Sequence, residues 1–138
     1  MKPLIAARLL VCVSLVYSLV VSAQAEEEKD TSKLKASLTV FDTVNQIRQR
    51  RGLKPFLMDR ALMEQAQATS MVRAKKKVAG HLRGWQGLHA KSEGCGTSQG
   101  CDLEGRKFIT CCLFEKWTYA GVGCAHLGGR TYYTLLVR

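Results

Sequence analysis

His81 and Glu93 are the two residues of this 138-residue sequence best suited to site chemistry. A carboxylate beside a histidine orients the imidazole ring and raises its basicity, so such a pair can act as a general base. The same groups could supply two ligands to a divalent metal ion, because zinc binds both imidazole nitrogen and carboxylate oxygen. The alternative is a hydrogen-bonded structural pair, and the residue types alone leave all three interpretations open.

Other residues of the glycine-rich second half could complete such a site. His89 could supply a further imidazole. Asp102 and Glu104 could each supply a further carboxylate, although acidic residues are most often solvated surface charges. Trp85 could line a ligand groove or pack in the core. The candidate binding cleft is therefore formed by His81, Trp85, His89 and Glu93.

Residues 1–25 have the organisation of a secretory signal peptide. Lys2 and Arg8 make the N-terminal region positive, an apolar run follows from Leu9 to Val20, and Ala23-Gln24-Ala25 gives a small-x-small cleavage site. The run is shorter than the roughly 20 apolar residues that span a bilayer, so we expect no transmembrane segment. We therefore expect a secreted product, extracellular or periplasmic. Removal of residues 1–25 lowers the net charge from +10 to +8 and the cysteine count from six to five.

The five remaining cysteines are expected to be partly oxidised, because exported proteins meet an oxidising environment. Adjacent cysteines in a strand point to opposite faces and need different partners. We expect one bridge between Cys95 and Cys101, and a second that joins Cys124 to either Cys111 or Cys112. A cysteine nucleophile is disfavoured for the same redox reason. Zinc held by cysteines is also not expected, because the sequence has no Cys-x-x-Cys pair.

Two helices are predicted in the first half of the mature chain. A polar lead-in over residues 26–37 precedes the first helix, which begins at Leu38 and ends just before Gly52. Asp59 is the predicted N-cap of the second helix, which runs to about Lys77. The apolar stripe of that second helix is predicted to be Leu62, Met63, Ala66, Met71 and Val72.

The strands are predicted near the C-terminus. The glycine-rich stretch after the second helix is expected to be mostly loops and turns, with at most one short strand. Strands are expected over residues 108–114, 117–125 and 131–137, and the last two form a hairpin through residues 126–130. Two helices followed by an antiparallel sheet indicate an α+β domain over residues 38–138.

Basic residues gather where the two predicted helices end. Such groups could attract anionic cell-envelope polymers or phospholipid headgroups. Alternatively, they could be solvated side chains that interact favourably with the negative end of the helix dipole. No aromatic residues are interleaved with them to stack bases, so specific nucleic-acid binding is not expected. The residues concerned are Arg48, Arg50, Arg51, Arg73, Lys75, Lys76 and Lys77.

The chain resembles the CAP superfamily, which includes cysteine-rich secretory proteins, antigen 5 and plant pathogenesis-related 1 proteins. The helical half carries Asn45-x-x-Arg48, Gly52-Leu53-x-Pro55 and Asp59-x-x-Leu62-x-x-x-Ala66 at the family's spacing. His81 follows where the family has its first cleft histidine, and Ser92-Glu93-Gly94 falls where the family has Gly-Glu-Asn. The segments 117–123 and 132–134 resemble the closing strands of the family.

The resemblance implies an α-β-α sandwich with a cleft on one face. In the family that cleft often holds two histidines and two acids, which can bind a divalent metal. This chain departs from the pattern, because Phe108 stands at the second cleft histidine and Cys111 at its partner asparagine. The second half is also abbreviated, so half of the four-residue set is missing.

We therefore predict a secreted CAP-like domain that binds a lipid, a glycan or another protein near His81 and Glu93. One alternative is a metal-dependent hydrolase, protease-like or nuclease-like, that uses these two residues with His89 or Asp102. Another alternative is an electrostatic binder of anionic cell-envelope polymers. No cofactor is expected, while a divalent metal ion held by His81 and Glu93 remains an alternative.

Overall fold

A computed structural model describes residues 31–82, 90–99 and 116–138, together with the single residues Ser22, Gln24, Glu28 and Cys112. The chain divides into two compact units, Met1–Leu34 and Lys35–Arg138. In the first unit the described residues have helical backbone. The second unit contains the sheet and the candidate site. Within the described residues, no helix has both the length and the apolar character needed to cross a membrane.

The first helix begins earlier than predicted and ends where predicted. Helical backbone covers residues 31–34 of the first unit and 35–50 of the second, so it starts before Leu38. Gly52 follows with a φ of +72°, in the left-handed region that favours glycine. The N–H of Gly52 donates to the carbonyl of Gln49, and the N–H of Leu53 donates to that of Arg48, both at 2.9 Å. This pair of bonds is a Schellman motif, which ends the helix.

Two residues of this helix hold the segment that follows it. The Asn45 side chain accepts a hydrogen bond from Phe56 N–H at 2.7 Å and donates one to the Phe56 carbonyl at 3.1 Å. Arg48 donates to the Lys54 carbonyl at 2.8 Å and lies 3.7 Å from the centroid of the Phe56 ring. Arg48 is buried, and this burial lowers its pKa. The expectation that Arg48 belongs to a basic surface is therefore wrong.

Helix α2 (Arg60–Lys76) begins at the predicted cap. Asp59 accepts a hydrogen bond from Leu62 N–H at 3.1 Å, and Lys77 ends the helix with a φ of 54°. The predicted apolar stripe is wrong at Val72, a residue that is 40% exposed. The buried stripe instead passes through two polar residues that follow Ala66 at helical spacing. The buried residues of α2 are Leu62, Met63, Ala66, Ser70, Arg73 and Ala74.

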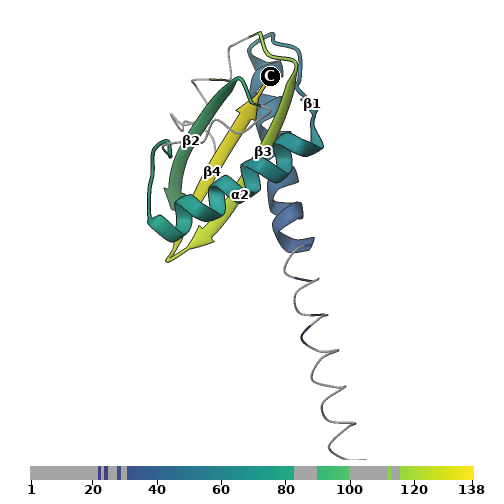
Figure 1. The fold of residues 1–138 in the computed structure, drawn as a ribbon. Coiled ribbons are helices and arrows are strands. Elements are labelled where there is room, and N and C mark those ends of the chain that lie inside the picture. The colour runs from purple at the N-terminus through teal and green to yellow at the C-terminus, as the bar shows by residue number, and fades with distance from the viewer. Residues whose placement is uncertain are drawn as a thin grey trace, which may run out of the picture. The chain divides into compact units, whose positions relative to one another are not determined.

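The sheet has four strands in the order β1-β3-β4-β2 (Figure 1). Their bounds are Leu57–Met58 for β1, Ser92–Gln99 for β2, Tyr119–Leu127 for β3 and Arg130–Val137 for β4. The predicted hairpin is confirmed, since β3 and β4 pair antiparallel through Gly128 and Gly129, both with positive φ.

Two features of the sheet differ from the prediction. The pairing of β1 with β3 is parallel, so the sheet is mixed and not wholly antiparallel. The eight-residue strand β2, antiparallel to β4, stands where mostly loops and turns were expected. The strand expected over residues 108–114 lies outside the described residues apart from Cys112, whose backbone is helical.

The two helices cover opposite faces of the sheet. Val40 and Val44 of the first helix share a buried cluster with Val122 of β3 and with the odd-numbered residues of β4, such as Leu135. Leu136, the next residue, packs instead against Leu62 and Ala66 of α2. Because successive side chains in a strand point to opposite faces, the helices lie on either side.

Helix α2 approaches β3 at backbone distance. A Cβ added to Gly121 would lie 2.1 Å from the backbone carbon of Leu62, and one added to Gly123 would lie 2.2 Å from that of Ala66. Only glycine fits at these two positions. Figure 1 shows α2 crossing in front of the strands at this close contact.

Side chains of α2 also complete the edge of β3. Strand β1 pairs only with Tyr119 and Ala120. Beyond that point Val122 N–H donates to the Met63 sulfur at 3.1 Å. The Gln67 side chain accepts from Cys124 N–H at 3.1 Å and donates to the Cys124 carbonyl at 2.9 Å. The Gln67 amide therefore forms the hydrogen bonds that a neighbouring strand would otherwise form.

Candidate functional site

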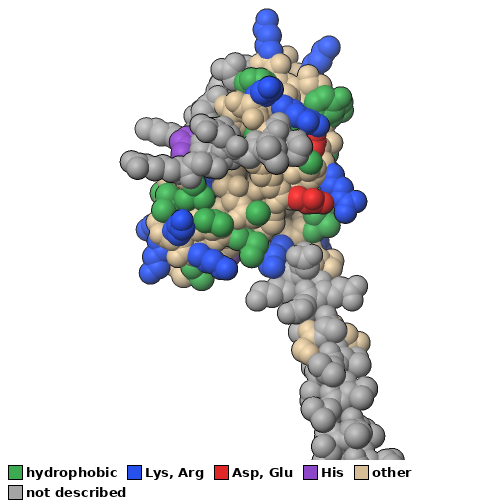
Figure 2. All heavy atoms as spheres, viewed as in Figure 1, with side chains coloured by type: hydrophobic (Ala, Val, Ile, Leu, Met, Phe, Trp, Pro, Cys, Tyr) green, Lys and Arg blue, Asp and Glu red, His purple; other side chains and the backbone are tan. Residues whose placement is uncertain are grey.

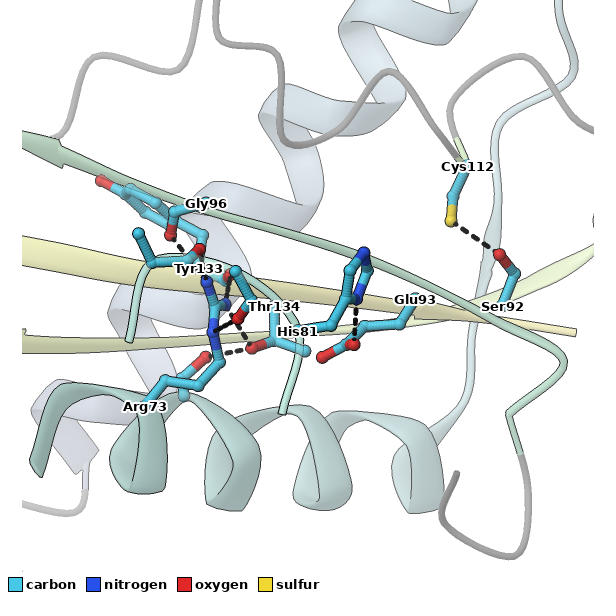
Figure 3. Close-up of polar contacts among 11 residues, drawn as sticks. Arg73, His81, Ser92, Glu93, Gly96, Cys112, Tyr133 and Thr134 are labelled. Carbon is cyan, nitrogen blue, oxygen red and sulfur yellow. Dashed lines mark hydrogen bonds and ion pairs between the residues drawn. The ribbon is translucent and has the colours of Figure 1, made fainter. Parts of the chain in front are cut away.

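The structure brings His81 and Glu93 into direct contact. Nδ1 of His81 lies 2.5 Å from Oε2 of Glu93 (Figure 3). The Glu93 side chain is 0% exposed, whereas that of His81 is 54% exposed. The pair therefore joins a buried carboxylate to an imidazole that solvent reaches.

Strand β2 positions the carboxylate. Glu93 lies opposite Leu136 in the β2–β4 ladder, and Cys95 lies opposite Thr134. Residues directly opposite each other in a ladder point to the same face. Because Leu136 packs against α2, Glu93 and Cys95 also lie on the α2 side of the sheet.

Arg73 connects α2 to the segment that carries His81. Its guanidinium donates to the carbonyls of Ala79 and Gly80, the latter at 3.0 Å. It also donates to the Tyr133 carbonyl and, at 3.2 Å, to the Thr134 hydroxyl of β4. A fifth bond, 3.4 Å long, reaches the Gly96 carbonyl on β2. This one side chain thus ties the residues before His81 to the strand that carries Glu93 (Figure 3).

The Arg73 side chain is fully buried. Burial lowers the pKa of its guanidinium, while the neighbouring Cys95 and Glu93 act in the opposite direction. An arginine stays protonated in proteins, so a positive charge lies beneath the site. The expectation that Arg73 belongs to a basic surface is wrong. Its spacing along α2, three residues after buried Ser70, is the signal that could have indicated burial.

The end of α2 directs the chain towards Glu93. Lys77 adopts the left-handed conformation, and Val78 N–H donates to the Arg73 carbonyl at 3.0 Å. Arg73 then fixes the next two carbonyls through its guanidinium. The turn that follows α2 is therefore held at both its backbone N–H and C=O groups, and His81 comes directly after it.

Cys95 is a third group at this site that sequence reasoning assigned to a different role. Its sulfur, a nitrogen of His81 and a carboxylate oxygen of Glu93 all lie within 4.8 Å of one another. Glu93-x-Cys95 is the spacing of two residues on one face of a strand. That signal was missed because no strand was firmly expected here.

Of the expected bridges, only the one between Cys124 and Cys112 has both cysteines among the described residues. No disulfide joins any two of Cys95, Cys112 and Cys124, the cysteines among the described residues. Buried Cys112 has its sulfur 3.3 Å from the Ser92 hydroxyl, and buried Cys124 has its sulfur 3.8 Å from the Ser37 hydroxyl. The bridge between Cys124 and Cys112 is therefore not formed. The other expected partners, Cys101 and Cys111, lie outside the described residues.

Several other candidates also lie outside the described residues. They are Trp85, His89, Asp102, Glu104 and Phe108. His126 is described, and it lies in the β3–β4 hairpin, where its Nδ1 is 3.1 Å from the Thr131 hydroxyl.

The exposed part of the predicted basic surface lies at the helix ends. Lys75, Lys76 and Lys77 are exposed, as are Arg50 and Arg51. Figure 2 shows basic side chains gathered over the C-terminal end of α2. Five of the seven basic residues named from the sequence are therefore at the surface.

Comparison with known proteins does not place the chain in a family. No family of known sequences matches it, and no curated protein matches it. The resemblance to the CAP superfamily therefore stays a prediction.

Proposed function

We propose that this chain is a secreted CAP-like domain that acts as a binding module, with its ligand site at His81 and Glu93. Helices on opposite faces of a sheet support the α-β-α architecture that the resemblance implies. The motif residues support it further, because each has a structural role that its type explains. Asn45 holds Phe56, Gly52 ends the first helix, and Asp59 caps α2.

The contact between His81 and Glu93 is the observation that carries the proposed site. A fully buried carboxylate fixes the orientation of the ring through a 2.5 Å contact. A ligand can reach that ring because more than half of the His81 side chain is exposed. An oriented and accessible polar group beside a buried charge suits recognition of a ligand. The ligand classes proposed are lipids, glycans and proteins.

The test measures binding to two defined probes, phosphatidylcholine vesicles containing sterol and an immobilised glycan array. We expect the full chain to bind at least one probe, and His81→Ala and Glu93→Gln each to weaken that binding by about tenfold or more, the cost of a charged hydrogen bond. His126→Ala, which removes an exposed histidine in the hairpin, is the matched control and should bind normally. Equal binding by all four proteins would contradict the proposed site, and binding to neither probe would contradict a lipid or glycan ligand.

The same assay separates the two alternatives. Binding that disappears at high salt and does not depend on His81 would indicate attraction by the exposed basic residues at the helix ends. Release of a cleaved product from a probe would indicate the hydrolase.

A further inference from the structure

We infer that His81, Glu93 and Cys95 together bind one thiophilic divalent cation, with zinc as the physiological candidate. The inference deepens the proposed function and rests on it, because it uses the same site. The donor set of one imidazole, one carboxylate and one thiolate differs from the two histidines and two acids that the family resemblance implies. It also differs from a Cys-x-x-Cys pair, whose absence from the sequence is the reason that zinc held by cysteines was not expected.

The three donor atoms are close enough for one ion. They all lie within 4.8 Å of one another. Tetrahedral zinc binds nitrogen and oxygen at about 2.0–2.2 Å and sulfur at about 2.3 Å, so its ligand atoms lie about 3.5 Å apart. The 2.5 Å contact between His81 Nδ1 and Glu93 Oε2 is shorter than this. Binding of the ion between them therefore requires these two atoms to move apart by about 1 Å.

The surroundings of the donors permit that adjustment. His81 lies outside any helix or strand, and its side chain is 54% exposed, so the ring can move. Cys95 is half-buried on β2, where a rotation about its Cα–Cβ bond redirects the sulfur. Glu93 is fully buried and provides the fixed point.

Arg73 holds the segments that carry the metal-binding side chains in place. Its bonds to the Ala79 and Gly80 carbonyls hold the segment that leads to His81. Its bond to the Gly96 carbonyl holds the residue next to Cys95. The separation between the two donor-bearing segments is thus set by one rigid, planar guanidinium. A metal site needs this kind of second layer to keep its ligands in place.

The charges of the site also accommodate a divalent cation. Binding of the ion releases the proton of the Cys95 thiol and any proton on the imidazole nitrogen that becomes the ligand. The Glu93 carboxylate and the Cys95 thiolate then carry two negative charges that balance the divalent ion, and the buried guanidinium of Arg73 lies beside them. The thiolate selects zinc and cobalt over magnesium and calcium, which prefer oxygen ligands. The same sulfur cannot also form the bridge to Cys101, so metal binding and that bridge exclude each other.

The experiment titrates the full, reduced chain with Co²⁺ and records the thiolate-to-cobalt charge-transfer absorption. We expect this absorption in the wild type, its displacement by Zn²⁺ and its loss in Cys95→Ser. Cys124→Ser, which alters a buried cysteine of the core, is the matched control and should keep the absorption. His81→Ala changes an exposed side chain, so it should fold normally and bind Zn²⁺ about tenfold or more weakly by calorimetry, the effect of losing one ligand.

Three results would overturn the inference. They are absence of the charge-transfer absorption in the wild type, its persistence in Cys95→Ser, and a Cys95–Cys101 disulfide in a protein that still binds zinc. If the chain does not bind cobalt or zinc but His81→Ala still weakens probe binding, the inference is wrong and the proposed function stands. Zinc binding that depends on Cys95, together with probe binding that His81→Ala leaves unchanged, would contradict the proposed function alone.

Discussion

Arg73 is a charged residue that is fully buried between α2 and the sheet, where all five of its described hydrogen bonds go to backbone carbonyls and the Thr134 hydroxyl. Its planar fork of donors is what makes this set of contacts possible, because the acceptors lie on three different segments. A lysine carries the same charge but only three donors at one point.

We therefore predict that Arg73→Lys lowers the free energy of unfolding by about 3 kcal/mol, because it leaves buried carbonyls without donors. Urea denaturation followed by circular dichroism measures this change. Arg60→Lys is the control, since Arg60 is exposed and pairs with Glu64 on the surface of α2. It should change stability by no more than about 0.5 kcal/mol. Similar small effects of both substitutions would show that the Arg73 contacts contribute little.

Asp59 makes the folding stability of the protein depend on pH in the acidic range. Burial alone would raise its pKa, but the hydrogen bond from Leu62 N–H and the charge of Arg138 outweigh burial, so the pKa is lowered. The unfolded chain, where an aspartate titrates near 3.9, then binds more protons than the folded chain. The stabilisation is complete well above about pH 4 and is lost as the pH falls through the folded-state pKa.

Asp59→Asn should therefore be less stable than the wild type near neutral pH and should lose less stability on acidification. The midpoint of urea unfolding, measured between about pH 6 and pH 3, checks this difference in slope. Parallel profiles for the two proteins would mean that another carboxylate dominates the acid response.

At the scale of the elements, the contact of α2 with β3 is set by two glycines. Gly123→Ala would place a methyl group 2.2 Å from the backbone carbon of Ala66, and neither backbone can yield without breaking the sheet or the helix. We expect a loss of about 3 kcal/mol or more, or failure to fold. Gly80→Ala is the control, because nothing lies within 4 Å of its added Cβ and its φ is not positive. Thermal denaturation of both variants measures the difference.

The sequence predicted the elements whose signals are local. Asp59 as cap, Gly52 as helix terminator and the Gly128-Gly129 hairpin all depend on residues next to one another, so their chemistry can be identified without the fold. Strand β2 was not firmly predicted because its Gly94 and Gly96 suggest turns, and only pairing with β4 makes this segment a strand. The parallel partner β1 has two residues and no sequence signal of its own.

Like the fold, the candidate site was predicted only in part. His81 and Glu93 were chosen from their types and from a resemblance, and the structure places them in contact. Arg73 was expected at the surface because it is charged. Its helical spacing with Ala66 and Ser70, which are buried, instead indicates burial. Cys95 was not assigned to the site because its role depends on which residues face it across the sheet.

At the scale of the whole molecule, export of the chain is a separate prediction. Residues 1–25 are proposed to be removed after Ala25, so the mature protein should begin at Glu26. N-terminal sequencing of the protein recovered from the medium or periplasm after expression with its own leader checks this. A chain that keeps Met1, or that stays inside the cell, would contradict the proposed secretion.

One hydrogen-bonded stretch of the β3 edge depends on the side-chain amide of Gln67. Its amide nitrogen donates to the Cys124 carbonyl, and its amide oxygen accepts from the Cys124 N–H, so both ends of one side chain are used. Deamidation to glutamate would keep the acceptor and remove the donor, since a carboxylate accepts only. The Cys124 carbonyl would then face a negative charge across the edge of β3. Conversion of this one amide to a carboxylate would thus remove one of the two hydrogen bonds between the α2 side chain and the edge of β3.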